Sequence, residues 1–296
     1  MIVVASCGHY SDDERIYHKQ IKSLKKISPS IKYFTYNNSD TIINNGIAHY
    51  HYKADKFSKN QYKNELLKFL SVNNLSILHI HDFELLSIAQ YVKYKNKRVK
   101  IIYDVHEDLI SMWDAFSSYS GIIKKAINQY LSICELKYLK YIDCFILANK
   151  FADLNRYNSI APIHIVENFP NIKYLNNSKS SEGIYKIIYH GQLDDNRGIL
   201  DLIDAFNILV KKYESLELQI IGKSRKPNFN DIMKNKIAHN SKITLSNQVP
   251  YNQIWKYLNN AHIGVIPFHD LSIFRKNTPT KLFEYMASNC AIVASR

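Results

Sequence analysis

A strand, a loop and a helix follow one another without a break in residues 186–206, KIIYHGQLDDNRGILDLIDAF. The β-branched and aromatic run at residues 187–190 is typical of a strand, and GQLDDNRG has the turn-rich composition of a loop. From Ile199 onward, apolar residues return at every third or fourth position, which predicts one face of a helix. These residues therefore form a βα unit, the building block of a parallel sheet covered by helices.

The same alternation continues on both sides of this unit. We predict further strands at residues 2–5, 31–36, 48–52, 77–81, 100–104, 144–148 and 163–166, and then at 216–221, 243–245, 263–267 and 291–294. Residues 170–183 are polar and turn-rich and carry no apolar period, which indicates a linker. The sequence thus predicts an α/β protein with one doubly wound domain at residues 1–169 and a second at residues 184–296.

The first helix is predicted to begin soon after the first strand. Ser11 and Glu14 have the S-x-x-E spacing of a capping box, and Tyr17, Ile21 and Leu24 supply an apolar stripe at helical spacing. We therefore expect Ser11 to cap the N-terminus of this helix.

The chain of 296 residues carries a formal net charge of +13 at pH 7, which suits an anionic partner such as nucleotide phosphates, nucleic acid or a phospholipid surface. Binding of nucleic acid would need clustered arginines with aromatic platforms or a recognised module, and neither is found, so nucleic acid is not expected. The opening MIVVAS predicts a strand and not a signal peptide. No segment approaches the roughly 20 apolar residues that span a bilayer, so we expect a cytoplasmic protein. The four cysteines lack metal-ligand spacing, and no metal site is expected.

Polar clusters follow several predicted strands, at the carboxyl ends where open α/β sheets bind their ligands. His106 follows the strand at residues 100–104, and its imidazole can donate or accept a hydrogen bond near neutral pH. Arg197 lies just before a helix start, where a fixed cation and the helix dipole together favour a diphosphate. Lys281 and Glu284 are three residues apart on one helix face, which suits a phosphate-binding cation beside a carboxylate that accepts ribose hydroxyls.

Each of these residues also has a purely structural interpretation. A lone histidine such as His106 usually supports the fold or caps a helix. Arg197 would then be a solvated loop arginine, and Lys281 and Glu284 would form a surface ion pair. The residues alone leave these alternatives open.

Eight segments, taken in order, resemble glycosyltransferase family 4. They are HYSDDERI, HIHDFELLSIA, IIYDVHED, VENFPN, HGQLDDNRGILDLIDAF, LELQIIG, VPYNQIWKYLNNAHIGVIPF and NTPTKLFEYMASNCAIVAS. They cover most of both predicted domains with the family's natural spacing. The resemblance implies a GT-B fold, in which two Rossmann-like domains face each other across a cleft that holds the active site.

The resemblance also implies an activity, the transfer of a sugar from a nucleoside diphosphate sugar to an acceptor hydroxyl with retention at the anomeric carbon. His106 would be the cleft histidine near the transferred sugar and the acceptor. Arg197, with help from Lys281, would neutralise the donor diphosphate beside the loop that begins at Gly191, and Glu284 would hold the nucleotide ribose. Members of the family usually need no metal ion or other cofactor, and we expect none, because fixed cations would stabilise the departing diphosphate.

The sequence departs from the family pattern in three places. Lys276 replaces the first acid of the family's E-x7-E motif, and Gln192 replaces the arginine that commonly follows Gly191. The family pattern would also continue beyond residue 296, so the second domain is expected to be incomplete. These departures leave open a non-catalytic remnant or partner subunit that retains the nucleotide pocket. A nucleotide-sugar epimerase on the same architecture is a further alternative.

Residues 121–141, GIIKKAINQYLSICELKYLKY, mix lysines with Ile, Leu and Tyr. One interpretation is an amphipathic helix that covers the first sheet. The other is a basic helix that rests on anionic lipid, which would hold a cytoplasmic protein peripherally at the inner face of the membrane. A lipid-linked saccharide would then be the acceptor, and the resemblance implies synthesis of a bacterial surface polysaccharide such as O-antigen or capsule.

Overall fold

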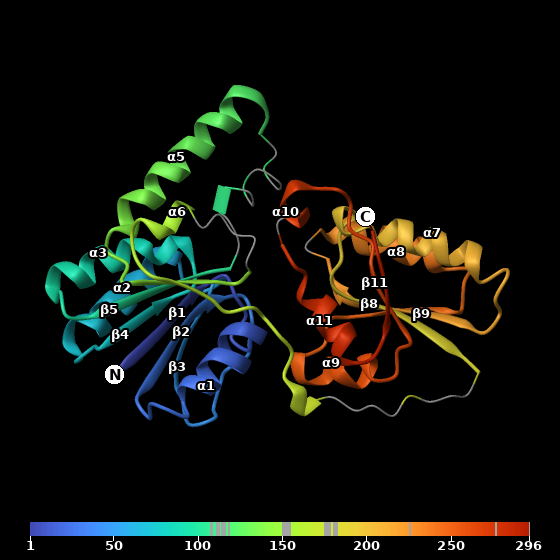
Figure 1. Ribbon diagram of the computed structural model, residues 1–296, viewed down its shortest axis with the longest axis horizontal. Helices are drawn as coiled ribbons and strands as arrows, with labels where there is room; N and C mark the ends of the chain where they lie inside the picture. The colour runs from blue at the N-terminus through green and yellow to red at the C-terminus, as the bar shows by residue number, and fades with distance from the viewer. Residues whose placement is uncertain are drawn as a thin grey trace. The chain divides into compact units, whose positions relative to one another are not determined.

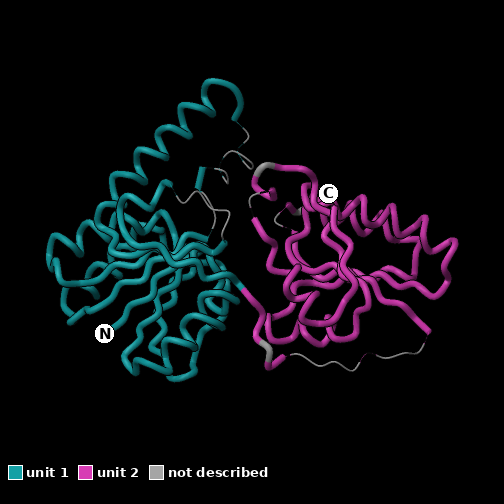
Figure 2. The backbone as a smooth tube through the Cα atoms, viewed as in Figure 1, with its two compact units in different colours: residues 1–168 teal, residues 169–296 magenta. Residues whose placement is uncertain are grey.

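The chain forms two compact units, Met1–Asn168 and Phe169–Arg296, in a computed structural model (Figure 2). The structure describes residues 1–106, 109–110, 113, 117, 119–149, 155–174, 179, 183–224, 226–275 and 277–295. Each unit contains its own parallel sheet with helices packed on both faces. The predicted α/β architecture is therefore confirmed. Residues 175–178 and 180–182 of the predicted linker lie outside the described residues.

The sheet of the first unit has seven parallel strands in the described part of the chain. Their order is β3 (Ala48–Lys53), β2 (Ile31–Asn37), β1 (Ile2–Cys7), β4 (Ile77–Ile80), β5 (Lys100–Val105), β6 (Cys144–Leu147) and β7 (Ile163–Ile165). The order reverses between β1 and β4. The loops that follow these two strands therefore diverge at the carboxyl edge of the sheet, which is where open α/β sheets bind ligands.

Helices cover both faces of this first sheet (Figure 1). On one face lie α2 (Lys59–Val72) and α3 (Leu86–Lys95), and on the other the π-helical segment η1 (Glu14–Ile21), which continues into α1 (Lys22–Leu24). The unit also contains η2 (Phe83–Leu85), α5 (Gly121–Leu139) and α6 (Asn155–Asn158). No helix in the described part of the chain combines the length and the apolarity that crossing a membrane requires.

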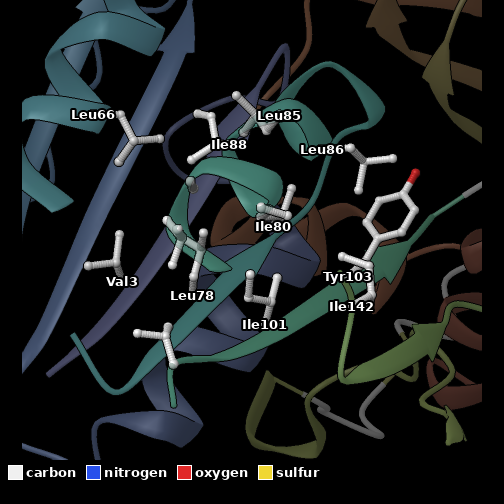
Figure 3. Packing of buried hydrophobic residues seen from close by; sticks show 14 of the residues in the cluster. Val3, Leu66, Leu78, Ile80, Leu85, Leu86, Ile88, Ile101, Tyr103 and Ile142 are labelled. Carbon is white, nitrogen blue, oxygen red and sulfur yellow. The ribbon is translucent and has the colours of Figure 1, made fainter. Parts of the chain in front are cut away.

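Side chains of β1 divide between two cores because successive residues of a strand point to opposite faces. Val3 and Ala5 join the core under α2 and α3, whereas Ile2 and Val4 join the core under η1. Figure 3 shows part of the larger core, in which Leu66 of α2 is fully buried. A strand buried on both faces explains why the opening run of the sequence is continuously apolar.

The second unit repeats this plan with five parallel strands in its described residues. Their order is β10 (Ile243–Ser246), β9 (Leu216–Lys223), β8 (Tyr185–Gln192), β11 (Ile263–Ile266) and β12 (Ala291–Ala294). On one face lie α7 (Ile199–Leu209) and α8 (Pro227–Ile237), and on the other α9 (Tyr251–Leu258) and α11 (Thr280–Ala287). The short helices are η3 (Ile172–Tyr174), η4 (Asp195–Arg197) and α10 (Ser272–Arg275). Here the strand order reverses between β8 and β11.

Each strand predicted from the sequence is present, and no end point differs by more than two residues. The predicted capping box at Ser11 is wrong. Asp13 caps η1 instead, because its carboxylate accepts the backbone N–H groups of Arg15 and Ile16, both at 2.9 Å. The Ser11 hydroxyl lies 3.2 Å from that of Thr35 on β2, so it ties the loop to the sheet.

Gly198 allows two loops of the second unit to touch. Its φ is +65°, in the left-handed region, and a Cβ added there would lie 1.8 Å from the carbonyl oxygen of Pro267, directly after β11. Any side chain at Gly198 must therefore push apart the loops that follow β8 and β11. These are the loops at the point where the strand order reverses.

We expect Gly198→Ala to destabilise the second unit by about 3 kcal/mol more than Gly183→Ala, measured as the loss of thermal stability. Gly183 is a matched control, because its φ is +70° and no atom of the described residues lies within 4 Å of an added Cβ. Its replacement therefore introduces only the strain of the left-handed backbone, about 1 kcal/mol. Equal losses in the two variants would contradict the close approach at Pro267.

Candidate functional site

Lys281 is buried in the second unit although it carries an ammonium group. It lies in the first turn of α11 and is 6% exposed, with Nζ 4.0 Å from the ring centroid of Tyr189 and 5.0 Å from that of Phe268. Among the described residues, no hydrogen-bond acceptor reaches Nζ. Burial and the charge of Arg197 lower the pKa of Lys281 well below its ordinary value of 10.5, despite two nearby carboxylates. A buried cation of this kind favours an anionic ligand.

Arg197 places a second cation against the same aromatic ring. It ends η4, and its Cζ lies 4.7 Å from the ring centroid of Phe268 and 4.8 Å from that of Phe274. In the described part of the chain, its buried Nε has no hydrogen-bond partner. Asp194 holds the loop by accepting the backbone N–H of Arg197 at 3.1 Å. Arg197 is half-buried, so it is not the solvated loop arginine of the alternative interpretation.

Gly191 leaves room for the ammonium of Lys281. Its φ is +116°, and an added Cβ would approach Lys281 Nζ to 3.1 Å. The next residue, Gln192, donates from Nε2 to the Asp194 carboxylate at 2.9 Å. The residue that replaces an arginine of the family pattern thus supports the loop that carries Arg197. Lys276, the other departure, lies outside the described residues.

Glu284 adds a buried carboxylate one helical turn after Lys281. It is 2% exposed, and its Oε2 lies 3.2 Å from Nε2 of His190 near the end of β8. Lys281 and Glu284 are therefore not a surface ion pair. A carboxylate in this position can accept hydrogen bonds from hydroxyl groups of a ligand.

Four of the five residues singled out from the sequence therefore meet in the second unit: Gly191, Arg197, Lys281 and Glu284. They gather at the carboxyl ends of β8 and β11, where the strand order reverses. The arrangement combines two cations that can bind an anion with a carboxylate that can bind hydroxyls. The fifth residue, His106, belongs to the first unit.

A buried ion pair stands at the carboxyl edge of the first sheet. Asp104 on β5 is fully buried and accepts hydrogen bonds from Arg15 Nη2 at 2.9 Å, from Arg15 Nε at 3.3 Å and from Gln20. Arg15 also donates to the carbonyl oxygen of Val166 at 2.6 Å, so it joins η1 to the chain after β7. Burial alone would raise the pKa of Asp104, but His106 and Arg15 outweigh it and lower the pKa below 3.8.

Three histidines lie around this carboxylate. His79 Nε2 and His81 Nδ1 are 3.9 and 3.6 Å from Asp104 Oδ2, and His81 Nδ1 is 3.0 Å from Nε2 of His106. Burial lowers the pKa of all three, that of His79 to about 4, so the imidazoles are neutral at pH 7. His106 directly follows β5, and its side chain is the most exposed of the three at 17%.

His9, in the loop after β1, is positively charged and lies at this edge of the sheet. Its Nδ1 lies 3.4 Å from Asp13 and its Nε2 3.4 Å from Asp82, and its ring centroid is 4.5 Å from that of His106. Burial alone would lower the pKa of His9, but the two carboxylates raise it well above 6.5. His9 in turn lowers the pKa of Asp13 to about 2, against the effect of burial.

The atoms of His79, His81 and Asp104 are close enough to suggest a metal centre. Each residue offers one ligand atom, and these atoms lie within 4.8 Å of one another. Both oxygens of Asp104 are, however, already bonded by Arg15 and Gln20. A dication would add to the buried charge of Arg15, which is unfavourable. We therefore assign no metal ion to this cluster.

Arg15, Asp104 and His9 were not identified from the sequence as functional candidates. Asp104 does carry a signal, since an acidic residue within an apolar strand must find a partner when it is buried. Its partner Arg15 lies 89 positions earlier in the chain, and no local pattern connects the two. Phe268 and Phe274 gave no signal, because aromatic residues after a strand usually belong to the core.

The comparison with protein families identifies one relationship. Residues 184–296 match the family model described as "Glycosyl transferases group 1". The match includes the second unit's strands and the four residues that meet there. A search of curated protein sequences finds no match to this chain.

Solved structures resemble nearly the whole chain. Sucrose-phosphate synthase from Thermosynechococcus elongatus has a TM-score of 0.71 at 13% identity, covering 99% of this chain and 81% of its own. The Anabaena protein HepE in complex with UDP-glucose has a TM-score of 0.68 at 11% identity, covering 99% of this chain and 80% of its own. A glycosyltransferase from Rickettsia africae has a TM-score of 0.67 at 16% identity, covering 99% of this chain and 78% of its own. This likeness confirms the predicted GT-B fold, and together with the matched domain it supports a transferase.

We expect His9→Gln to lower the melting temperature at pH 5 by about 2–4 °C, the equivalent of about 1 kcal/mol, and to have little effect at strongly alkaline pH. The pKa of His9 is raised in the folded chain, so its contribution is complete below 6.5 and is lost as pH rises through the raised pKa. Thermal melts of both proteins across this range measure the difference. A difference that stays constant with pH would contradict a charged His9.

Proposed function

We propose that this chain is a retaining glycosyltransferase of family 4 that moves a sugar from a nucleoside diphosphate sugar to a saccharide or lipid-linked acceptor. One observation carries the proposal. The ammonium of Lys281 is buried beside Arg197, and no hydrogen-bond acceptor among the described residues reaches it. An ammonium buried beside a second cation is unfavourable unless an anion joins them. The glycosyl transferases group 1 match over residues 184–296 supports a nucleotide-sugar diphosphate as that anion.

In this proposal, Lys281 and Arg197 stabilise the departing diphosphate. Negative charge develops on the leaving group as the bond to the sugar breaks, so cations already in place bind the transition state more strongly than the ground state. The anion also raises the lowered pKa of Lys281, because it favours the charged ammonium. With two fixed cations supplying the compensating charge, we propose transfer without a metal ion or another cofactor.

Glu284 would hold the nucleotide ribose. Its buried carboxylate can accept hydrogen bonds from two hydroxyls, and His190 lies within 3.2 Å to orient it. HepE, which shares the fold, has been solved with UDP-glucose, so a protein of this architecture binds such a donor. His106, at the carboxyl edge of the first sheet, would contact the transferred sugar and the acceptor.

A panel of nucleoside diphosphates and their sugars (UDP, GDP, ADP, UDP-glucose and GDP-mannose) tests the donor site by thermal stabilisation. We expect one nucleotide class to raise the melting temperature, because a ligand that binds only the folded chain stabilises it by mass action. Lys281→Met should weaken this binding at least about tenfold, the size of a lost charged hydrogen bond. Lys256→Met, which removes an exposed lysine of α9 in the same unit, should bind like the wild type.

Three other outcomes would contradict the proposal in different ways. Binding without release of nucleoside diphosphate in the presence of acceptors would indicate a non-catalytic protein. Conversion of the donor sugar in the absence of any acceptor would indicate an epimerase. If no member of the panel stabilises the chain, the proposed nucleotide site itself is contradicted.

We further propose that α5 rests on anionic lipid and that the acceptor is lipid-linked, in the synthesis of a cell-surface polysaccharide. On this helix Ile122 is 86%, Tyr130 66% and Ile133 59% exposed, whereas Glu135 and Leu139 are buried. At about 100° per residue, the first three lie on the side opposite the last two. Figure 1 shows the N-terminal half of α5 extending past the helices that cover the first sheet. An apolar face with lysines on the same helix suits a negatively charged membrane surface.

Co-sedimentation with vesicles tests this contact. We expect the protein to pellet with phosphatidylglycerol vesicles and not with phosphatidylcholine vesicles, since lysines of α5 would bind the anionic headgroups. The double variant Ile122→Ser/Ile133→Ser should reduce the bound fraction at least about tenfold, because two side chains no longer enter the apolar layer. Ile208→Ser is the matched control, since Ile208 is 71% exposed on α7. Equal binding of the double variant and the control would contradict a role for α5.

A further inference from the structure

His81 links the buried carboxylate of Asp104 to His106. Its side chain is fully buried, and its Nδ1 faces two atoms, Nε2 of His106 at 3.0 Å and Oδ2 of Asp104 at 3.6 Å. The backbone N–H of His81 donates to the carbonyl oxygen of Ala5 at 3.1 Å, so the sheet holds its position. Its other ring nitrogen, Nε2, is buried and has no hydrogen-bond partner in the described part of the chain.

A neutral pair of imidazoles can share this hydrogen bond in two ways. In the first, His81 Nδ1–H donates to His106 Nε2, and the proton of His106 sits on Nδ1. In the second, His106 Nε2–H donates to His81 Nδ1, and the proton of His81 sits on Nε2.

The surroundings of His81 favour the first arrangement. The second would bury an N–H donor at His81 Nε2, for which the described residues offer no acceptor, and this is unfavourable. It would also turn the lone pair of His81 Nδ1 toward the Asp104 carboxylate at 3.6 Å. The first arrangement instead points an N–H at that negative charge. Both effects act in the same direction.

We propose that His81 is a positioning residue that fixes His106 as the Nδ1–H tautomer, so that His106 acts as a hydrogen-bond donor and not as a proton acceptor. His106 Nε2 accepts the hydrogen bond from the N–H of His81. If Nε2 were protonated, two N–H donors would face each other. In this tautomer the remaining N–H of the partly exposed His106, at Nδ1, can donate to an oxygen of a ligand. On the proposed function, that oxygen belongs to the transferred sugar or the acceptor. Donation orients this oxygen and leaves its proton in place. The proton of the acceptor can then pass to the leaving phosphate during a retaining transfer.

The tautomer can be measured without any substrate. The full chain is labelled with ¹⁵N-histidine, and long-range ¹H–¹⁵N correlation spectra are recorded at neutral pH. His106→Gln identifies the signals of His106 among the 12 histidines. We expect a protonated Nδ1 and an unprotonated Nε2. A protonated Nε2 in the wild type overturns the proposal, whatever the variants do.

Two buried histidines of the same strand region provide a matched pair of variants. His81→Leu removes the donor, and we expect His106 to shift toward the Nε2–H form. His79→Leu removes a buried imidazole whose Nε2 has no hydrogen-bond partner in the described part of the chain, and we expect His106 to keep Nδ1–H. An unchanged tautomer in His81→Leu would overturn the role of His81.

Activity separates positioning from a purely structural effect. Relative to His79→Leu, His81→Leu should lower the rate of sugar transfer about tenfold, the size of one lost hydrogen bond, with unchanged nucleotide binding. His81→Asn, which keeps an N–H near the place of Nδ1, should restore most of the rate. Equal rates in the two leucine variants would overturn the functional part of the inference. If no transfer occurs with any donor, the proposed function fails, while the tautomer result still decides the arrangement of the histidines.

Discussion

The second unit holds an ammonium group in its interior, and its candidate site is arranged around that group. The ring of Tyr189 lies 4.0 Å from Lys281 Nζ, and the ring of Phe268 serves both Lys281 and Arg197. Aromatic faces replace part of the lost hydration, but they do not neutralise charge. The packed cores on both faces of the sheet must offset the remainder. A ligand of opposite charge would find the site already formed, which is the usual source of strong electrostatic stabilisation.

The strand order reverses in both units, but the residues at the point of reversal differ in chemistry. In each sheet the strand order reverses once near the middle, and polar residues collect at the carboxyl ends of the strands on either side. The first unit gathers neutral imidazoles around the Arg15–Asp104 ion pair, together with carboxylates at Asp13 and Asp82. Such groups exchange hydrogen bonds with hydroxyls. The second unit gathers cations, which suit phosphates.

The sheets could be predicted from the sequence because short β-branched runs and helical apolar periods are local patterns. The convergence of Arg197, Lys281 and Glu284 came from a resemblance, since no local pattern connects residues 84 or more positions apart. The capping prediction failed because Ser11 found a partner on β2, and Asp13 was closer to the first turn. The sequence could not tell whether α5 covers the sheet or meets lipid, because both kinds of helix share the same apolar periodicity.

The contact of Arg197 with Phe268 and Phe274 has a consequence for selectivity. The rings of Phe268 and Phe274, with centroids 4.7 and 4.8 Å from Cζ, attract the guanidinium without accepting classical hydrogen bonds from its N–H groups. Those donors form a rigid fork that matches two oxygens of one tetrahedral group better than a single point of charge. A lysine at position 197 would preserve the sign of the field and lose this geometry. An arginine at position 197 can therefore discriminate between anions by shape as well as by charge.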